Sequence, residues 1–199
     1  MAIFPFINKK DSRVTKCYGV IDKQYKSGKH DGLDMVCDTN RSIIAISAGK
    51  VIRNGYLPST WGEYVVVRQA DGKSIVYAHL ERHSSQVYLD QNIQEGYTIG
   101  RMGKTGNSTG YHLHIEIQNK YYEPGDTSDI AEYLGIKNKV GKVEDILQVE
   151  LVKIKTPKGQ ELAIEGVNIE GANYVKLRPV LEALGFNVGW EDKTVIIEE

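Results

Sequence analysis

Two histidines lie one residue apart in a segment whose apolar and polar residues alternate, Gly110-Tyr111-His112-Leu113-His114-Ile115-Glu116-Ile117-Gln118. A period of two predicts a β-strand, with the apolar residues in a core and both imidazoles on the opposite face. Imidazole is a common zinc ligand, so the pair suits one metal ligand and one group beside the metal. A solvent-exposed polar face is the alternative interpretation of the same pattern.

A histidine and a carboxylate lie four residues apart nearer the N-terminus, in Lys29-His30-Asp31-Gly32-Leu33-Asp34-Met35. Residues i and i+4 share a face in a helix and in an extended segment, and Gly32 disfavours the helix. In either geometry His30 and Asp34 can converge on one cation. Such pairs also occur by chance on protein surfaces, so this spacing alone does not identify a site.

The other two histidines are less informative by themselves. In Ile75-Val76-Tyr77-Ala78-His79-Leu80, alternation predicts that His79 shares a strand face with Ile75 and Tyr77. A single histidine at a strand end is more often structural than catalytic. His83 lies in a polar stretch without strand alternation, and we assign it no role.

Glycines and hydroxyl side chains precede the alternating segment, in Gly103-Lys104-Thr105-Gly106-Asn107-Ser108-Thr109-Gly110. Its first three residues are similar to the end of a phosphate-binding loop, but that motif requires glycine where this chain has Thr98. We therefore reject nucleotide binding. We expect a tight loop beside an extended substrate, with Asn107 and Thr109 as substrate contacts.

The elements around these residues are mostly strands. Runs of β-branched and aromatic residues predict strands over 51–53, 64–67, 74–77 and 112–118. Asp71-Gly72 predicts a hairpin turn, and the only helix expected in this part is short, from Asp129 to Leu134. The pattern predicts a mainly β fold built on an antiparallel sheet.

A change in composition and in the pattern of predicted elements divides the chain into domains. We expect a first domain over 1–136, a polar and glycine-containing linker over 137–145, and a small α+β domain over 146–199. Within that last domain, residues 167–175 predict a hairpin around Gly171, and Leu177 to Leu184 predicts a helix.

Composition argues against several other classes of protein. Lys and Arg number 25 against 26 Asp and Glu, and no basic run stands out, so nucleic acid is not an expected partner. No apolar stretch approaches the roughly 18–20 residues of a membrane span. The first ten residues lack the basic and apolar regions of a secretory signal, so none is expected. Cys17 and Cys37 allow a disulfide or two partly buried thiols, and the sequence does not decide between them.

Taken together, three motifs resemble the lysostaphin-like zinc metallopeptidases of peptidoglycan: His30-x-x-x-Asp34, Tyr77-Ala78-His79-Leu80 and Ser108-Thr109-Gly110-Tyr111-His112-Leu113-His114. The order and spacing match over roughly residues 12–125. The resemblance implies a β-sheet catalytic domain with a groove that holds one Zn²⁺.

The resemblance also implies roles for individual residues. His30, Asp34 and His114 would be the zinc ligands, while His79 and His112 would flank the open position and handle the catalytic water. Tyr111 stands where the family commonly has proline, so we expect it to lie in the groove wall and to influence substrate preference.

The tail has a weaker resemblance of its own, carried by Gly171 to Pro179, Leu184-Gly185-Phe186, Trp190-Glu191-Asp192 and Thr194-Val195-Ile196. It is similar to the small stalk-like domain named after the amine oxidase N-terminus, which recurs in Gram-positive cell-surface proteins. The tail has no His or Cys to bind copper. The resemblance implies a wall-targeting or spacer module, with a stability or dimerisation module as the alternative.

These patterns together predict a zinc endopeptidase that cuts the peptide part of bacterial peptidoglycan. We expect a phage endolysin made in the cytoplasm without a signal peptide and acting on the cell wall, with a monomer favoured. A bacterial wall-remodelling hydrolase is the first alternative. A non-catalytic activator of another wall hydrolase is the second, and the five filled positions argue against it.

Overall fold

The computed structural model describes residues 2–23, 25–119 and 125–144, and in the C-terminal part residues 149–155, 161–169, 172–175, 182, 187–191 and 194–198. Contacts between Cα atoms divide the chain into two units, Met1–Ile146 and Leu147–Glu199. Each is described by itself. None of the helices described is long and apolar enough to cross a membrane.

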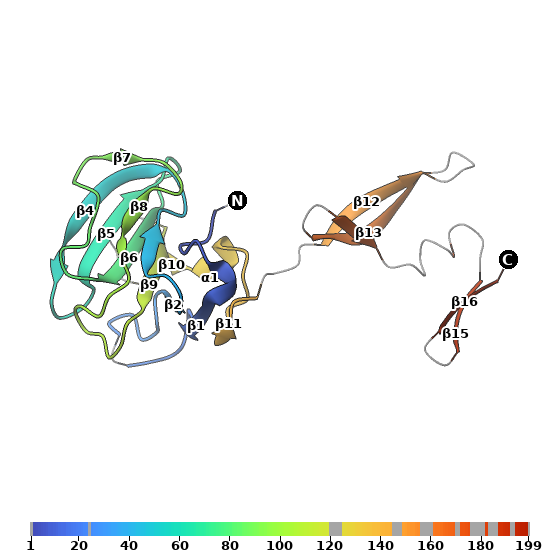
Figure 1. The fold of residues 1–199 in the computed structure, drawn as a ribbon, viewed down its shortest axis with the longest axis horizontal. Coiled ribbons are helices and arrows are strands. Elements are labelled where there is room, and N and C mark those ends of the chain that lie inside the picture. The colour runs from blue at the N-terminus through green and yellow to red at the C-terminus, as the bar shows by residue number, and fades with distance from the viewer. Residues whose placement is uncertain are drawn as a thin grey trace. The chain divides into compact units, whose positions relative to one another are not determined.

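Among the described residues of the first unit, nine strands form one antiparallel sheet (Figure 1). Eight of them follow the order β11-β1-β2-β9-β6-β5-β4-β7. β10 pairs with Ile117 and Gln118 of β9, beyond the residues of β9 that pair with β2. The strands are β1 (Ser12–Lys16), β2 (Leu33–Cys37), β4 (Gly49–Leu57), β5 (Gly62–Arg68), β6 (Ser74–Leu80), β7 (Asn92–Ile93), β9 (Leu113–Gln118), β10 (Thr127–Ser128) and β11 (Gly141–Lys142). The expected antiparallel, mainly β fold is confirmed.

Smaller elements complete the unit: η1 (Lys9–Asp11), the pair β3 (Ser42–Ile44) and β8 (Thr98–Arg101), and α1 (Ile130–Tyr133). The short helix expected from Asp129 to Leu134 is α1, and Asp129 caps it by accepting a hydrogen bond from the Ala131 backbone. The expected turn at Asp71-Gly72 joins β5 to β6, with Gly72 at φ 88°. Both local predictions are confirmed.

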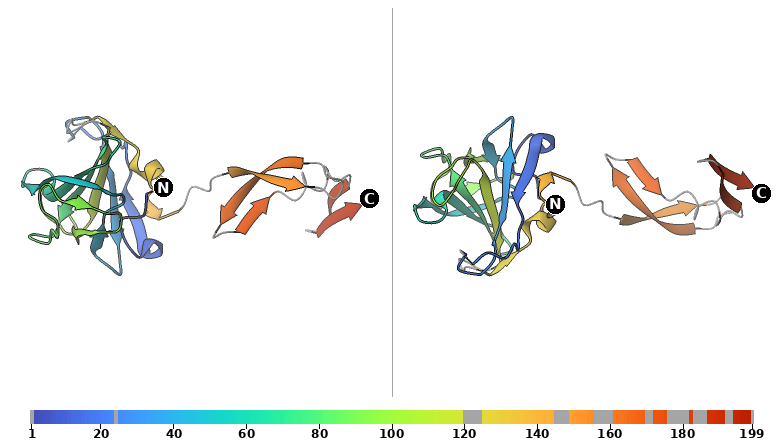
Figure 2. Two further views of the ribbon diagram at one scale, coloured as in Figure 1. Left: turned by 90° about the horizontal axis from the view of Figure 1, so that it is seen from above. Right: turned by 90° about the horizontal axis from the view of Figure 1, so that it is seen from below.

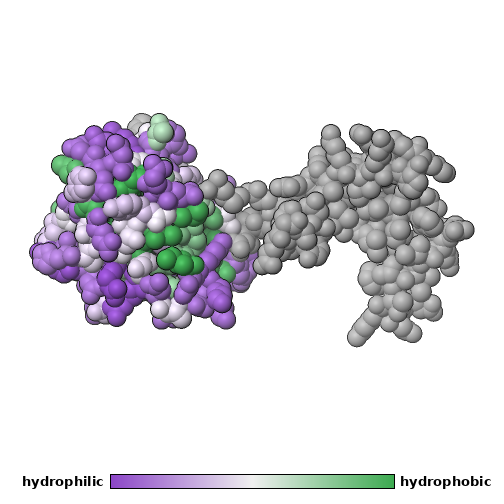
Figure 3. Space-filling model, turned by 45° about the horizontal axis from the view of Figure 1, so that its top comes forward, coloured by the Kyte–Doolittle hydropathy of each residue, from purple (hydrophilic) through white to green (hydrophobic). Residues whose placement is uncertain are grey.

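The two faces of the large sheet bury different side chains. On one face, apolar residues such as Tyr77, Ile115 and Ile117 pack with β3, β8, α1 and the N-terminal segment in one core. Figure 2 shows the strands of the first unit from two further sides. The other face carries a smaller cluster of Tyr64, Val66, Val76 and Ala78. Hydrophilic side chains cover most of the first unit as seen in Figure 3, apart from a cluster of hydrophobic atoms. The polar residues of β9 lie on the face opposite the main core.

The prediction for His79 was wrong in one respect. Tyr77 pairs with Val65 and Leu80 pairs with Glu63, so β6 contains one residue more than β5 between these pairs. This is a β-bulge, and His79 adopts φ 58° within it. Because the bulge breaks the period of two, Leu80 returns to the core while His79 leaves the face of Ile75 and Tyr77.

Part of the segment expected as a linker is hydrogen-bonded to the first unit. β11 pairs with β1 through Arg13 and Val14, and the Val143 backbone donates to the Ser12 carbonyl. Strand pairing thus continues past residue 136, and the unit extends to Ile146.

The second unit contains β12 (Val149–Lys155), β13 (Glu161–Ile169) and β14 (Ala172–Val175) in one antiparallel sheet. β15 (Asn187–Glu191) and β16 (Thr194–Glu198) form a separate hairpin. Ile169 pairs with Ala172, so the expected hairpin around Gly171 is confirmed. The helix expected from Leu177 to Leu184 lies outside the described residues, except for Glu182, whose backbone is helical.

Candidate active site

A groove of about 500 Å³ lies on the sheet face opposite the main core. Strands β2, β6 and β9 contribute polar side chains to it, and so does Lys16 at the end of β1. Its lining residues are Lys16, Tyr25, Lys26, Asp31, Asp34, Leu57, Ser59, Thr60, Trp61, His79, Asn107, Ser108, Thr109, His112, His114, Glu116 and Gln118.

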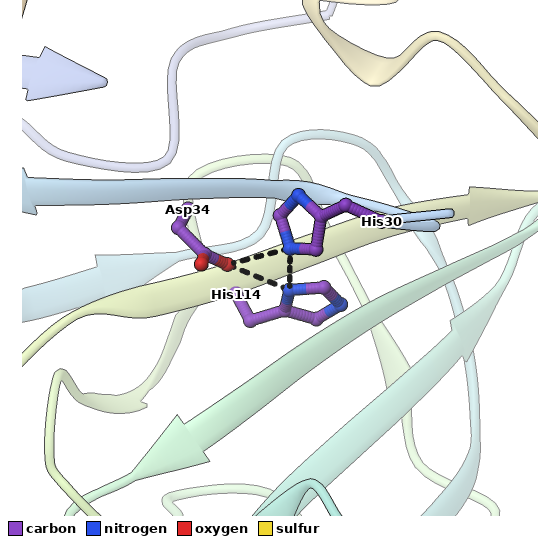
Figure 4. Close-up of side chains that lie close together, drawn as sticks. All are labelled: His30, Asp34 and His114. Atoms are coloured by element: carbon purple, nitrogen blue, oxygen red, sulfur yellow. Dashed lines mark hydrogen bonds and ion pairs between the residues drawn. The ribbon is translucent and has the colours of Figure 1, made fainter. Parts of the chain in front are cut away.

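Three side chains converge at this face of the sheet (Figure 4). Asp34 Oδ1 lies 2.7 Å from His114 Nδ1 and 3.1 Å from His30 Nε2, and the two nitrogens are 3.1 Å apart. Asp34 of β2 is directly paired with His114 of β9, which explains why residues 80 positions apart meet. Two nitrogens and a carboxylate oxygen at such separations are a suitable donor set for a metal ion such as zinc.

The imidazole of His30 is fully buried and held at its other nitrogen. Its Nδ1 donates to the Cys17 carbonyl at 2.8 Å, because a carbonyl can only accept. In the tautomer with the proton on Nδ1, the lone pair of Nε2 faces Asp34 and His114. Such a hydrogen bond to the remote nitrogen is how proteins orient histidine ligands.

His114 is held between two carboxylates. Its Nε2 lies 2.8 Å from Glu116 Oε1, and Glu116 also accepts hydrogen bonds from Gln118 and Trp61. Although burial lowers it, the hydrogen bonds to Asp34 and Glu116 raise the pKa of His114 to about 10. The ring thus carries protons on both nitrogens, and a metal ion bound at Nδ1 would replace one of them.

The carboxylate of Asp34 stays ionised at this site. Burial by itself would raise its pKa, but the close contacts with the imidazoles of His114 and His30 outweigh burial and hold the pKa far below its usual range. An anionic oxygen is therefore available beside the two imidazoles.

Gly32 makes room for this arrangement. A Cβ at this position would lie 2.7 Å from His114 Cε1 and 2.5 Å from the Ile115 carbonyl oxygen. No larger side chain fits there without moving the ring, so the glycine between His30 and Asp34 has a steric reason.

His79 and His112 form a second pair beside the three converging side chains. Their ring centroids are 4.6 Å apart, and His79 lies 5.8 Å from the His114 ring. His79 Nδ1 donates to the Thr105 carbonyl at 2.8 Å, and His112 Nδ1 donates to the Gly110 carbonyl at 3.0 Å. Each neutral ring keeps Nε2 as a proton acceptor. Burial, together with the neighbouring His114 and His112, lowers the pKa of His79 to about 4.

The polar side of β9 is buried. His114, Glu116 and Gln118 are at most 5% exposed, so the alternative of a solvent-exposed polar face is wrong. Leu113, Ile115 and Ile117 lie in the main core, which confirms the alternation.

The substrate-contact residues expected from the sequence lie in different places. Asn107 and Thr109 line the groove. Tyr111 does not; it is 55% exposed, and the Arg41 guanidinium lies 4.8 Å from its ring centroid.

Both cysteines, Cys17 and Cys37, are free, so the interpretation as two thiols applies.

Sequence reasoning missed two residues of the site. Glu116 shares the strand face of the two histidines, and this alternation could have indicated its contact with His114. Trp61 reaches the groove from the connection before β5, where no sequence pattern marks it.

Residues 28–126 match the sequence model of peptidase family M23. Endolysin 2638A of Staphylococcus phage 2638A is 24% identical over 180 residues, which are 81% of this chain and 36% of that protein. The DD-carboxypeptidase/endopeptidase Mpg of Neisseria meningitidis serogroup B is 34% identical over 89 residues, 45% of this chain and 20% of that protein. The chain thus spans about a third or less of these relatives.

The fold also matches a solved structure. The catalytic domain of the antimicrobial peptidase lysostaphin from Staphylococcus simulans superposes with a TM-score of 0.56 at 26% identity. The match covers 61% of this chain and 90% of that domain.

Proposed function

The chain belongs to peptidase family M23, a family of metallopeptidases, and from this premise we propose that it is a zinc-dependent endopeptidase acting on bacterial peptidoglycan. The observation that carries the proposal is the convergence of His30 Nε2, Asp34 Oδ1 and His114 Nδ1 beside a groove. His30 and His114 are both held at their remote nitrogens, as histidine ligands of zinc commonly are. We assign these three residues as the metal ligands.

Three protein ligands leave a coordination position open for water or substrate, as in catalytic zinc sites. A bound Zn²⁺ would polarise the scissile carbonyl and lower the pKa of a bound water to about 7. The mixed nitrogen and oxygen donor set supports zinc over the hard cations, which prefer oxygen ligands alone.

We assign His79 and His112 to proton transfer. His79 stays neutral at physiological pH because its pKa is lowered to about 4, so Nε2 can accept a proton from the attacking water. His112 Nε2 lies 3.8 Å from Asp34 Oδ1, beside the three proposed metal ligands. A protonated His112 can donate to the developing oxyanion or to the leaving amine.

Peptidoglycan as substrate is supported by the kinds of protein that the chain is similar to, which are an endolysin, a DD-carboxypeptidase/endopeptidase and an antimicrobial peptidase. Asp34 and His114 line the groove, and we assign Asn107 and Thr109, which also line it, to contacts with an extended peptide. The similarity to Endolysin 2638A extends over 81% of the chain and supports a phage lysin that acts on the host cell wall.

We further propose that residues 147–199 form a wall-binding or spacer module. The Leu147–Glu199 segment is a unit of its own, which supports a separate task. Pull-down on purified cell walls should retain the full chain better than a chain ending at Ile146, and equal retention would reject targeting.

Metal content and hydrolysis together test the proposed function. Protein stripped with a chelator should be inactive on purified sacculi, and adding one equivalent of Zn²⁺ should restore the release of new amino groups. Zinc-loaded protein that releases none would leave a non-catalytic activator as the better description.

A further inference from the structure

Thr105 connects the end of β6 to the ring of His79, although its side chain does not line the groove. We propose that Thr105 is a positioning residue that fixes the orientation and tautomer of His79. The proposal rests on the proposed function, in which His79 accepts a proton at Nε2.

The Thr105 hydroxyl bridges two strands at the bulge. Oγ1 donates to the Leu80 carbonyl at 2.6 Å and accepts from the Glu63 backbone at 2.9 Å. Glu63 and Leu80 are the paired residues of β5 and β6 next to the extra residue of β6. The hydroxyl thus satisfies backbone groups where the bulge disturbs the regular ladder.

The carbonyl of the same residue holds the imidazole. His79 Nδ1 donates to Thr105 O at 2.8 Å, which leaves Nε2 unprotonated in the neutral ring. The His79 backbone is also fixed, because its N–H donates to Trp61 and its carbonyl accepts from Gly103. The Thr105 side chain therefore holds the strands at the bulge, and the Thr105 carbonyl holds the His79 ring.

A close backbone contact keeps the 103–110 loop in place. Gly62 and Gly106 both adopt positive φ, and a Cβ on either would collide with the backbone of the other segment. The Asn107 backbone donates to the Thr60 carbonyl at 2.9 Å in the same contact. This contact holds the residues that follow Thr105 against the start of β5, and the Thr105 hydroxyl supplies the hydrogen bonds that hold Thr105 itself.

The hydrogen bonds of Thr105 give the Gly103-Lys104-Thr105 segment a structural role that does not involve phosphate binding. Valine has the shape of threonine but cannot donate to Leu80 or accept from Glu63. In Thr105→Val the carbonyl is expected to move away from His79, and the ring then samples the tautomer protonated at Nε2. Serine retains the hydroxyl and both hydrogen bonds.

The experiment uses the zinc-loaded full chain and compares Thr105→Val, Thr105→Ser and the control Thr98→Val, which alters a partly buried threonine of β8 outside the groove. We measure the ¹⁵N shifts of the His79 ring, the zinc stoichiometry, and initial rates on sacculi. Thr105→Val should lower the apparent kcat at least about tenfold, with KM and zinc content unchanged, and should show a mixture of His79 tautomers. Thr105→Ser and Thr98→Val should retain activity and a single tautomer.

A Thr105→Val protein with the wild-type tautomer and a kcat within twofold of wild type would overturn the proposal. If that variant does not fold, the wild-type spectrum decides, because a His79 ring protonated at Nε2 contradicts the Thr105 contact. Wild-type protein that leaves sacculi intact would reject the proposed function, whereas the tautomer measurement would still test the positioning by Thr105.

Discussion

Glu116 Oε1 lies 2.8 Å from Nε2 of His114, on the side of the ring opposite Asp34. The buried carboxylate therefore orients the ring whose other nitrogen faces His30 and Asp34. Carboxylate–histidine contacts of this type increase ligand basicity and fix ring orientation at metal sites.

Replacing Glu116 should weaken metal binding. Glu116→Met removes the acceptor for His114, and the affinity for Zn²⁺ should fall about 10–100-fold. Glu116→Gln keeps one acceptor oxygen and should lie between Glu116→Met and wild type. Competition with a chromophoric chelator measures the affinity. Asp31→Asn is the matched control, since Asp31 lines the groove but bonds to Ser27 and Thr127 instead. Equal affinities for Glu116→Met and the control would contradict the role of Glu116.

Gly32→Ala should displace the His114 ring by a steric contact. The added Cβ would meet His114 Cε1 at 2.7 Å, so we expect weaker Zn²⁺ binding and a loss of about 1–3 kcal/mol in the free energy of unfolding. Gly110→Ala is the control, because a Cβ there meets no atom within 4 Å. Chelator competition and urea unfolding measure the two effects. A Gly32→Ala protein indistinguishable from Gly110→Ala would mean that the ring can move freely.

The division between metal ligands and proton-transfer residues predicts different losses. His114→Ala should lose zinc, because it removes Nδ1 from the converging atoms. His79→Ala should retain zinc and lose hydrolysis, because its Nδ1 bonds to Thr105 and not to that group. Atomic absorption on both purified variants measures the metal. Equal zinc loss in the two would overturn the assigned roles.

Stability of the zinc-stripped protein should depend on pH through His114. Its pKa is raised from 6.5 to about 10 by Asp34 and Glu116, despite burial. This stabilisation is complete below pH 6.5 and is lost as pH rises toward 10. Between pH 6.5 and 8.5 the free energy of unfolding should fall by up to about 1.4 kcal/mol per pH unit.

Urea unfolding with chelator present measures this slope. Trp61 fluorescence in a Trp190→Phe background reports on the first unit alone. His114→Gln should flatten the pH dependence. A wild-type free energy that stays constant or rises over this range would contradict the stabilisation of protonated His114.

The sequence predicted what depends on local periodicity. Alternation located β9 and the faces of His114 and Ile115 correctly, because a regular strand has a period of two. It failed at His79, where a bulge paired across β5 and β6 breaks that period. A bulge depends on contacts with another strand and with Thr105, which no local pattern records.

Tertiary contact also explains the other differences. Trp61 donates a hydrogen bond to Glu116, which lies 55 positions further along the chain. Tyr111 stacks with Arg41, which also comes from a distant part of the chain. The convergence of His30, Asp34 and His114 followed from the family resemblance more than from spacing. Register pairing of β2 with β9 gives it a physical cause.

Mass spectrometry of purified sacculi after digestion tests the central claim most directly. Zinc-loaded wild-type protein should produce muropeptides with a newly formed amino terminus at one kind of peptide bond, whereas chelator-treated protein and His79→Ala should produce none. Identical muropeptides from wild type and His79→Ala would contradict the account of a zinc endopeptidase.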